Sequence, residues 1–273
     1  MKFADLHIHT HFSDSTLSPS EVIEQAYKAD LYAIAITDHD TIDGIKPSLK
    51  AAEKYGIEVI SGVELSSEIN GKDVHILGYF FDYENLLLNE KLNLMQEIRV
   101  ERMKKMIEKL YGLGVKDITL EEVCLLAQSK AVGRPHLASV LMKKKKVGTT
   151  KEAFDKFLAE GAAAYVPKFQ QSPLEAIELI HQAGGLCVLA HPMFTSMDEI
   201  IPALVKSGLD GIEAYYPHCS LNVVNFYEGL AKKNNIFVTG GSDSHGKARP
   251  QTFIGRIKLP YTFVEGMKEK LKK

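Results

Sequence analysis

Short hydrophobic runs, rich in β-branched residues, recur along the chain. Each run is about five to eight residues long and lacks a helical period, which is typical of buried parallel strands. The runs cover residues 2–6, 32–37, 58–65, 74–81, 186–190, 211–215 and 236–240, so seven strands are predicted. Amphipathic stretches separate several of them. Strands and helices in alternation indicate an α/β fold, and we expect the sheet to close into a barrel.

Helix boundaries are marked by capping residues and glycines. Ser18 and Pro19 provide an N-cap and a first-turn proline for a helix that begins near residue 19. Further helices are predicted at 45–55, 173–183 and 197–206, each followed closely by glycine. Glycine just past a helix supplies the left-handed residue that ends it.

One long segment interrupts the alternation of strands and helices. From residue 82 to residue 167 no strand is predicted, and the hydrophobic spacing between Leu92 and Leu110 is that of one helical face. Shorter helices are expected near 120–129, 136–144 and 151–160. We therefore expect residues 1–81 and 168–273 to form the barrel, and residues 82–167 to form a helical insertion. Because the insertion follows the end of a strand, it should lie over the active-site mouth as a lid that recognises substrate.

Composition narrows the class of protein. The chain has 273 residues, of which 45% are hydrophobic and 25% charged, as in ordinary globular proteins. Its net charge of −2 gives no overall attraction for nucleic acid. The three cysteines show no CxxC spacing, which argues against a disulfide framework. No secretory leader or membrane-spanning run is evident, so we expect a cytoplasmic protein with no membrane partner.

Histidines and carboxylates gather at the predicted strand ends. His7 and His9 close the first strand, and His39 follows the second. A lone His-x-His pair is weak evidence, but the pattern repeats along the chain. The full set of nine candidates is His7, His9, Asp14, His39, Glu64, His75, His191, Asp243 and His245. The carboxyl ends of parallel strands converge on one face of such folds, where active sites lie.

Imidazoles and carboxylates without thiolates suit Zn, Mn or Fe(II). Nine ligands exceed the needs of one ion, so two or three closely spaced divalent ions are expected. The alternative is a set of separate core histidines, each with its own hydrogen bonds. Six of the chain's ten histidines lie at predicted strand ends, which argues against that alternative.

The sequence resembles the PHP (polymerase and histidinol phosphatase) family of metal-dependent phosphoesterases. The matching motifs are Asp5-Leu6-His7-Ile8-His9-Thr10 with Asp14, Thr37-Asp38-His39-Asp40, Gly62-Val63-Glu64, His75, His191 and Asp243-Ser244-His245. The resemblance spans nearly the whole chain and implies a distorted seven-stranded (β/α) barrel. It is greatest to the branch that dephosphorylates nucleoside 3′,5′-bisphosphates and trims short RNA from its 5′ end. That branch also carries a helical insertion with a Gly-Arg-Pro-His motif, found here at Gly133-Arg134-Pro135-His136.

The resemblance also implies how the ligands divide. His7, His9, Glu64 and Asp243 would hold a first ion; Glu64, His75 and His191 a second; and Asp14, His39 and His245 a third. Glu64 would bridge the first two ions. The implied reaction is hydrolysis of a small phosphorylated substrate, a nucleotide, by metal-bound hydroxide.

Other residues are assigned roles around the metals. Arg134 and His136 are expected to act in catalysis and, with Lys168, to contact substrate phosphate, because a guanidinium binds phosphate through two parallel hydrogen bonds. Arg99 and Arg102 are expected to be solvated or paired with Glu97 or Glu101.

Alternative functions remain open from the sequence. One is a 5′–3′ exonuclease on short RNA or DNA ends, and another is a histidinol-phosphate phosphatase. A non-enzymatic PHP module that binds a partner would lack ligands, and none is missing. Amidohydrolase chemistry is chemically possible but lacks the expected carbamylated-lysine arrangement. The oligomeric state is left open.

Overall fold

In the computed structural model, residues 1–127, 131–167 and 171–272 are described. Eight strands form one nearly closed barrel in the order β7-β6-β5-β4-β3-β2-β1-β8. The strands are β1 (Phe3–Ile8), β2 (Ala33–Ile36), β3 (Glu58–Ile69), β4 (Lys72–Tyr79), β5 (Leu186–Leu189), β6 (Gly211–Tyr215), β7 (Phe237–Gly240) and β8 (Leu259–Pro260). The predicted α/β barrel is therefore confirmed, whereas the predicted count of seven strands is wrong.

The sheet departs from the prediction in its extra strand and in the direction of β4. β8 has only two residues and pairs antiparallel with β1, so it is too short to give a hydrophobic pattern. β4 runs antiparallel to both β3 and β5, although parallel strands were expected. The cause is the two-residue turn at Asn70 and Gly71, whose φ angles are 53° and 79°. An Asn-Gly turn of this kind joins neighbouring antiparallel strands.

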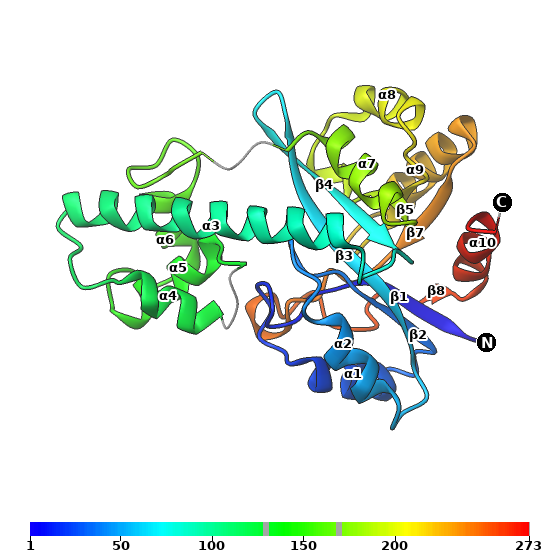
Figure 1. The fold of residues 1–273 in the computed structure, drawn as a ribbon, viewed down its shortest axis with the longest axis horizontal. Coiled ribbons are helices and arrows are strands. Elements are labelled where there is room, and N and C mark those ends of the chain that lie inside the picture. Colours follow the sequence, from blue (N-terminus) through cyan, green and yellow to red (C-terminus); the bar gives the residue numbers. More distant parts are fainter. Residues whose placement is uncertain (128–130, 168–170, 273) are drawn as a thin grey trace.

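Helices surround the barrel (Figure 1). They are α1 (Pro19–Lys28), α2 (Ile45–Ala52), α7 (Pro173–Gln182), α8 (Ile201–Lys206), α9 (Leu221–Asn234) and α10 (Thr262–Lys270), with short 3₁₀ turns at Pro192–Phe194, Asp198–Ile200 and Gly246–Ala248. The predicted cap of α1 is present: the Ser18 hydroxyl accepts a hydrogen bond from the Glu21 amide at 3.3 Å. None of the helices in the described ranges combines the length and hydrophobicity needed to cross a membrane.

The segment between β4 and α7 is helical. It contains α3 (Leu86–Gly112), α4 (Leu120–Ala127), α5 (Arg134–Lys143), α6 (Thr150–Ala153) and a π-helix at Phe154–Leu158. Figure 1 shows α3 running from the barrel to a lobe that contains α4, α5 and α6. The first turns of α3 pack in the barrel cluster through Leu88 and Leu92, whereas Met103 and Leu110 belong to the hydrophobic cluster of the lobe. The helix α3 therefore packs in both clusters and connects the lobe to the barrel.

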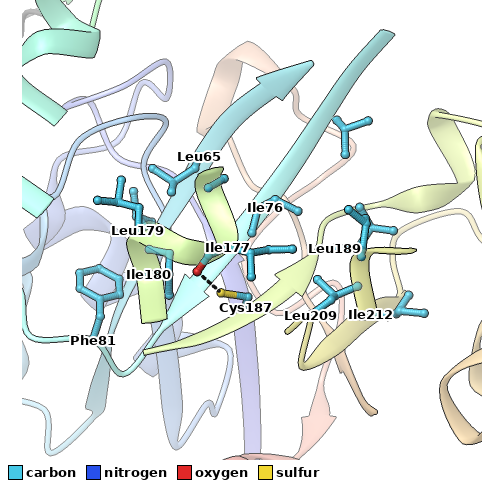
Figure 2. Close-up of a cluster of buried hydrophobic side chains, with 14 of the residues drawn as sticks. Leu65, Ile76, Phe81, Ile177, Leu179, Ile180, Cys187, Leu189, Leu209 and Ile212 are labelled. Atoms are coloured by element: carbon cyan, nitrogen blue, oxygen red, sulfur yellow. Dashed lines mark hydrogen bonds between the residues drawn. The ribbon is translucent and has the colours of Figure 1, made fainter. Parts of the chain in front are cut away.

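The largest hydrophobic cluster lies between the sheet and α7 (Figure 2). Ile177 and Ile180 of α7 pack with Leu65 and Ile76 of β3 and β4. Cys187 is buried in this cluster, and its thiol donates a hydrogen bond to the Ile177 carbonyl at 3.3 Å. This packing holds β3, β4 and β5 in place.

The barrel closes where β1 meets the segment after β7. The His9 amide donates to the Ser244 carbonyl at 3.1 Å, and the Ser242 amide donates to Asp5 Oδ1 at 2.8 Å. Gly241 lies directly against β1: a Cβ atom added there would be 2.3 Å from the His7 backbone nitrogen. Only glycine allows the two segments to approach this closely.

Replacing Gly241 by alanine is expected to destabilise the protein by about 2–3 kcal/mol, because the new methyl group would push β1 away from the segment after β7. The same displacement should weaken divalent-ion binding. Urea unfolding and ion titration measure the two effects. Gly229→Ala is the matched control, because no atom lies within 4 Å of an added Cβ there. Equal stabilities of the two variants would contradict the proposed role of Gly241.

Candidate metal centre

The histidines and carboxylates found in the motifs come together at one end of the barrel. His7 and His9 lie at and just beyond the end of β1, Glu64 lies within β3, and His191 follows β5. The remaining members follow their strands or lie in neighbouring loops: Asp14, His39, Asp243 and His245, with His75 in β4. All are buried or nearly so. Segments far apart in the sequence thus form a single cluster.

His75 reaches the cluster because of the reversed direction of β4. It lies near the start of its strand and pairs with Ser66, two residues beyond Glu64. Antiparallel neighbours run in opposite directions, so the first residues of β4 lie beside the last residues of β3. A parallel β4 would have carried the early residue His75 to the opposite end of the barrel.

Glu64 lies at the centre of the cluster, and its two oxygens face different imidazoles. Oε2 is 3.1 Å from His7 Nε2 and 3.2 Å from His9 Nε2. Oε1 is 2.6 Å from His75 Nδ1 and 2.9 Å from His191 Nε2. A carboxylate held in this way can serve two ions at once.

Two further carboxylates extend the cluster away from Glu64. Asp243 Oδ1 is 3.1 Å from His9 Nε2, and Asp14 Oδ1 is 3.0 Å from His245 Nε2. Within this cluster, three groups have ligand atoms within 4.8 Å of one another: His7, His9, Glu64 and Asp243; His9, Asp14, His39 and His245; and His39, Glu64 and His75. The first is the group implied by the family resemblance. The second adds His9 to the implied third site, and the third contains His39 where His191 was expected.

The electrostatics of the cluster favour bound cations. Burial by itself raises the pKa of Glu64, Asp14 and Asp243, but the neighbouring imidazoles hold all three pKa values well below the usual range. These carboxylates are therefore ionised. Burial lowers the pKa of His39 to about 3, so its ring is neutral and offers a lone pair. For His7 and His9 the facing carboxylates outweigh burial and raise the pKa, that of His9 to about 9, so a cation that binds there replaces a proton. Ionised carboxylates and neutral imidazoles are the forms that bind metal.

Buried atoms without hydrogen-bond partners give a further test of whether ions fit. Four such atoms in this cluster are Asp14 Oδ1, His39 Nδ1, His191 Nδ1 and His245 Nε2, although Asp14 Oδ1 and His245 Nε2 face each other at 3.0 Å without hydrogen-bond geometry. Buried polar atoms normally have partners, because an unsatisfied group costs about 1–3 kcal/mol. Divalent cations would provide them, so the residues present fit a metal centre.

Glu213 is a site residue that the sequence reasoning missed. It is fully buried in β6, and its Oε1 accepts a hydrogen bond from His7 Nδ1 at 2.9 Å. Its Oε2 accepts from the His191 amide at 2.8 Å. Such a carboxylate fixes the tautomer of a ligand histidine and directs its other nitrogen towards the metal. The available signal was a glutamate within an otherwise apolar strand.

Two cavities adjoin the cluster. The larger, about 850 Å³, contains an aromatic wall in which Phe194 and Tyr216 pack edge to face at 5.1 Å. The smaller, about 210 Å³, is lined by Arg99, Arg102 and Arg134. His218 also lines the larger cavity. The metal centre is therefore open to a ligand on both an aromatic and a cationic side.

The arginines of the smaller cavity are placed differently from the prediction. Arg99 pairs with Asp40, with Nε 2.8 Å from Oδ2, so the expectation that it is solvated or pairs with Glu97 or Glu101 is wrong. Glu97 and Arg99 are two residues apart on α3 and therefore do not share a helical face. Burial, and then Arg134 and Arg99, lower the pKa of Arg102 to about 10. Guanidinium groups gathered in this way form an attractive environment for an anion.

The expected phosphate contacts have different surroundings. Arg134 is in the first turn of α5 and lines the smaller cavity. Its Nη2 is 3.9 Å from Asp73 Oδ2. His136 lines it too, but its Nδ1 accepts a hydrogen bond from the Gly133 amide at 3.0 Å and so helps to cap α5. Lys168, the third expected contact, lies outside the described residues.

A family model for the PHP domain matches residues 5–231. The chain belongs to this family. It is 36% identical over 246 residues to a 5′-3′ exoribonuclease of Haemophilus influenzae, covering 88% of this chain and 89% of the relative. It is 30% identical over 256 residues to a 3′,5′-nucleoside bisphosphate phosphatase of Chromobacterium violaceum, covering 92% of this chain and 90% of the relative. A solved structure described as a metal-dependent phosphoesterase of Bifidobacterium adolescentis superposes with a TM-score of 0.88 at 30% identity, covering 97% of this chain and 94% of that one.

These likenesses confirm the family and the class of reaction inferred from the motifs. This PHP protein is a metal-dependent phosphoesterase.

Proposed function

We propose that this PHP protein removes phosphate from nucleoside 3′,5′-bisphosphates. The observation that carries the proposal is the arginine-lined cavity directly beside the cluster around Glu64: His39 and His75 line this cavity together with Arg99, Arg102 and Arg134. A substrate with two phosphates can place one at the ions and the other among the arginines. The relative named as a 3′,5′-nucleoside bisphosphate phosphatase supports this choice of substrate.

Two or three divalent ions, Mn, Zn or Fe, would be held by His7, His9, Asp14, His39, Glu64, His75, His191, Asp243 and His245. Glu64 is placed to bridge, because its two oxygens face different imidazoles. When bound, such ions supply Lewis acidity, which activates water and neutralises charge on a reacting phosphate. Glu213 keeps His7 in the orientation that this requires.

The helical segment 82–167 would supply substrate recognition. Arg134 and His136 come from α5, whereas every proposed metal ligand lies in the barrel segments 1–81 and 168–273. Arg134 would hold the phosphate that does not react, through two parallel hydrogen bonds. His136 would support that position through the cap of α5 and contribute its ring to the cavity wall.

The test is an activity screen of protein loaded separately with Mn, Zn or Fe(II). We expect release of inorganic phosphate from a nucleoside 3′,5′-bisphosphate with a kcat/KM at least about 10²-fold above that for the matching nucleoside 5′-monophosphate, because the monophosphate cannot occupy both places. Histidinol phosphate should be a poor substrate for the same reason. Equal rates on all three esters would contradict the proposed substrate.

A second candidate is 5′–3′ trimming of short RNA. It is favoured by the larger cavity, whose aromatic wall is open beside the cluster and could accommodate the next nucleotide. The relative named as a 5′-3′ exoribonuclease supports it. Stacking of bases on aromatic side chains does not depend on sequence. Incubation with a 5′-phosphorylated oligoribonucleotide distinguishes the two functions, because trimming would release mononucleotides stepwise from the 5′ end.

A further inference from the structure

Arg249 lies in the loop after β7, where the two cavities meet. Four of the described residues line both cavities: His39, Asp73, His75 and Arg249. Arg249 is the only arginine or lysine among these four. Its position at the boundary distinguishes it from Arg134, which lines the smaller cavity alone.

The contacts of Arg249 leave most of its hydrogen-bonding capacity free. Nη1 donates to Asp243 Oδ2 at 2.9 Å, and the Tyr216 hydroxyl donates to the same oxygen at 2.6 Å. A guanidinium carries five N–H donors. Within the described ranges the side chain of Arg249 has no other hydrogen-bond partner, and 44% of it is exposed. Its remaining donors are therefore available to a ligand between the cavities.

The loop holds the Arg249 backbone in a defined position. Its carbonyl accepts hydrogen bonds from both the amide and the hydroxyl of Thr252, each at 3.0 Å. The Lys247 amide donates to Thr16 Oγ1 at 2.8 Å, which ties the loop to the segment after β1. A cation fixed before the substrate arrives costs little reorganisation during the reaction.

Arg249 is a permanent cation, because a guanidinium does not lose its proton in proteins. The carboxylates of the cluster, of which Asp243 Oδ2 lies 2.9 Å from Arg249 Nη1, balance this charge. When cations neutralise these carboxylates, the guanidinium can interact with a further anion. A phosphoryl group in reaction spreads negative charge over its non-bridging oxygens, and arginine is well suited to stabilise it.

We propose that Arg249 is a catalytic residue that donates hydrogen bonds to a non-bridging oxygen of the reacting phosphate. The inference rests on the proposed phosphoesterase function and adds a cation to the reaction site that belongs to no metal motif. It separates two arginine roles. Arg249 acts on the phosphate that reacts, whereas Arg134 holds the phosphate that does not.

The experiment compares Arg249→Ala and Arg249→Lys with wild type on two substrates. One is an aryl phosphate with a single phosphate group, and the other is a nucleoside 3′,5′-bisphosphate. We expect Arg249→Ala to lower kcat by about 10²-fold on both, as the loss of one charge-stabilising donor typically does. Arg249→Lys should recover part of this loss, because the charge is kept. Ion content should stay at the wild-type value, and inorganic phosphate should inhibit Arg249→Ala less strongly.

Two further variants separate chemistry from the positioning of Asp243. Tyr216→Phe removes the other donor to Asp243 Oδ2 and so reports what loosening this carboxylate does. Arg256→Ala removes an arginine that stacks on Phe253 in the same part of the chain and should behave as wild type. The proposal requires that Arg249→Ala and Tyr216→Phe differ, with the larger loss of kcat and of phosphate inhibition in Arg249→Ala.

Three results would overturn the inference while leaving the proposed function intact: wild-type kcat in Arg249→Ala, loss of ions in Arg249→Ala, or a loss of activity confined to the bisphosphate. Failure of the wild-type protein to hydrolyse any phosphate ester would instead overturn the proposed function, and this inference with it.

Discussion

Replacing Glu64 by glutamine is expected to remove more than one divalent ion from each chain and to lower kcat/KM by at least about 10³-fold. Both carboxylate oxygens are engaged: Oε2 is 3.1 Å from His7 Nε2, and Oε1 is 2.6 Å from His75 Nδ1. An amide keeps the shape of the side chain but loses its charge, and its nitrogen cannot bind a metal in place of the second oxygen. Elemental analysis and steady-state kinetics measure the two effects.

Glu58→Gln is the matched control for this change. Glu58 begins the same strand, but it accepts a hydrogen bond from the Tyr261 hydroxyl at 2.5 Å and pairs with Lys268, away from the cluster. Its ion content should equal that of wild type, expected to be two to three ions per chain. The bridging role of Glu64 is wrong if Glu64→Gln retains all its ions or loses only one.

Replacing Arg134 by alanine is expected to lower kcat/KM for a nucleoside 3′,5′-bisphosphate by about 10²–10³-fold, because a charged hydrogen-bonded pair at a desolvated site typically contributes 2–5 kcal/mol. On an aryl phosphate the change should be less than about threefold, since that substrate has no second phosphate. The energy of the remote contact is also used at the transition state, so kcat should fall together with affinity. Arg134 lies on α5, apart from every metal motif, and ion content should therefore be unchanged.

Arg134→Lys tests the geometry of this contact. Lysine keeps the charge but cannot form two parallel hydrogen bonds, so most of the loss on the bisphosphate should remain. The half-buried neighbour Arg102 would still attract the second phosphate, which sets a limit on the total loss. If Arg134→Ala reduces activity on both substrates equally, the arginine-lined cavity does not bind the second phosphate.

Much of the fold follows from local patterns. The first seven strands were located within a few residues from hydrophobic runs alone, α1 from its serine cap and first-turn proline, and α7 from the glycines that follow it. The face of α3 that carries Leu92, Met103 and Leu110 is buried as its spacing predicts. These features depend on residues close together in the sequence, and periodicity records them directly. The metal motifs are likewise short, so they can be read before any contact is known.

Contacts between distant segments could only come from the tertiary structure. The turn at Asn70 and Gly71 reverses β4 and brings His75 to the cluster, although Asn-Gly was a signal that the strand analysis overlooked. β8 consists of two residues that pair with β1, and so short a strand carries no period of its own.

The partners of charged side chains are the clearest case. Glu97 is near Arg99 in the sequence, but Arg99 pairs with Asp40, 59 residues away. Glu213 lies 206 residues from His7, and Arg249 lies near the smaller cavity only because the loop after β7 packs beside β1. The sequence alone determined which residue types are available for metal and phosphate chemistry. Barrel closure and strand direction determined which of them meet, because hydrogen bonds and ion pairs depend on positions in space rather than on separation along the chain.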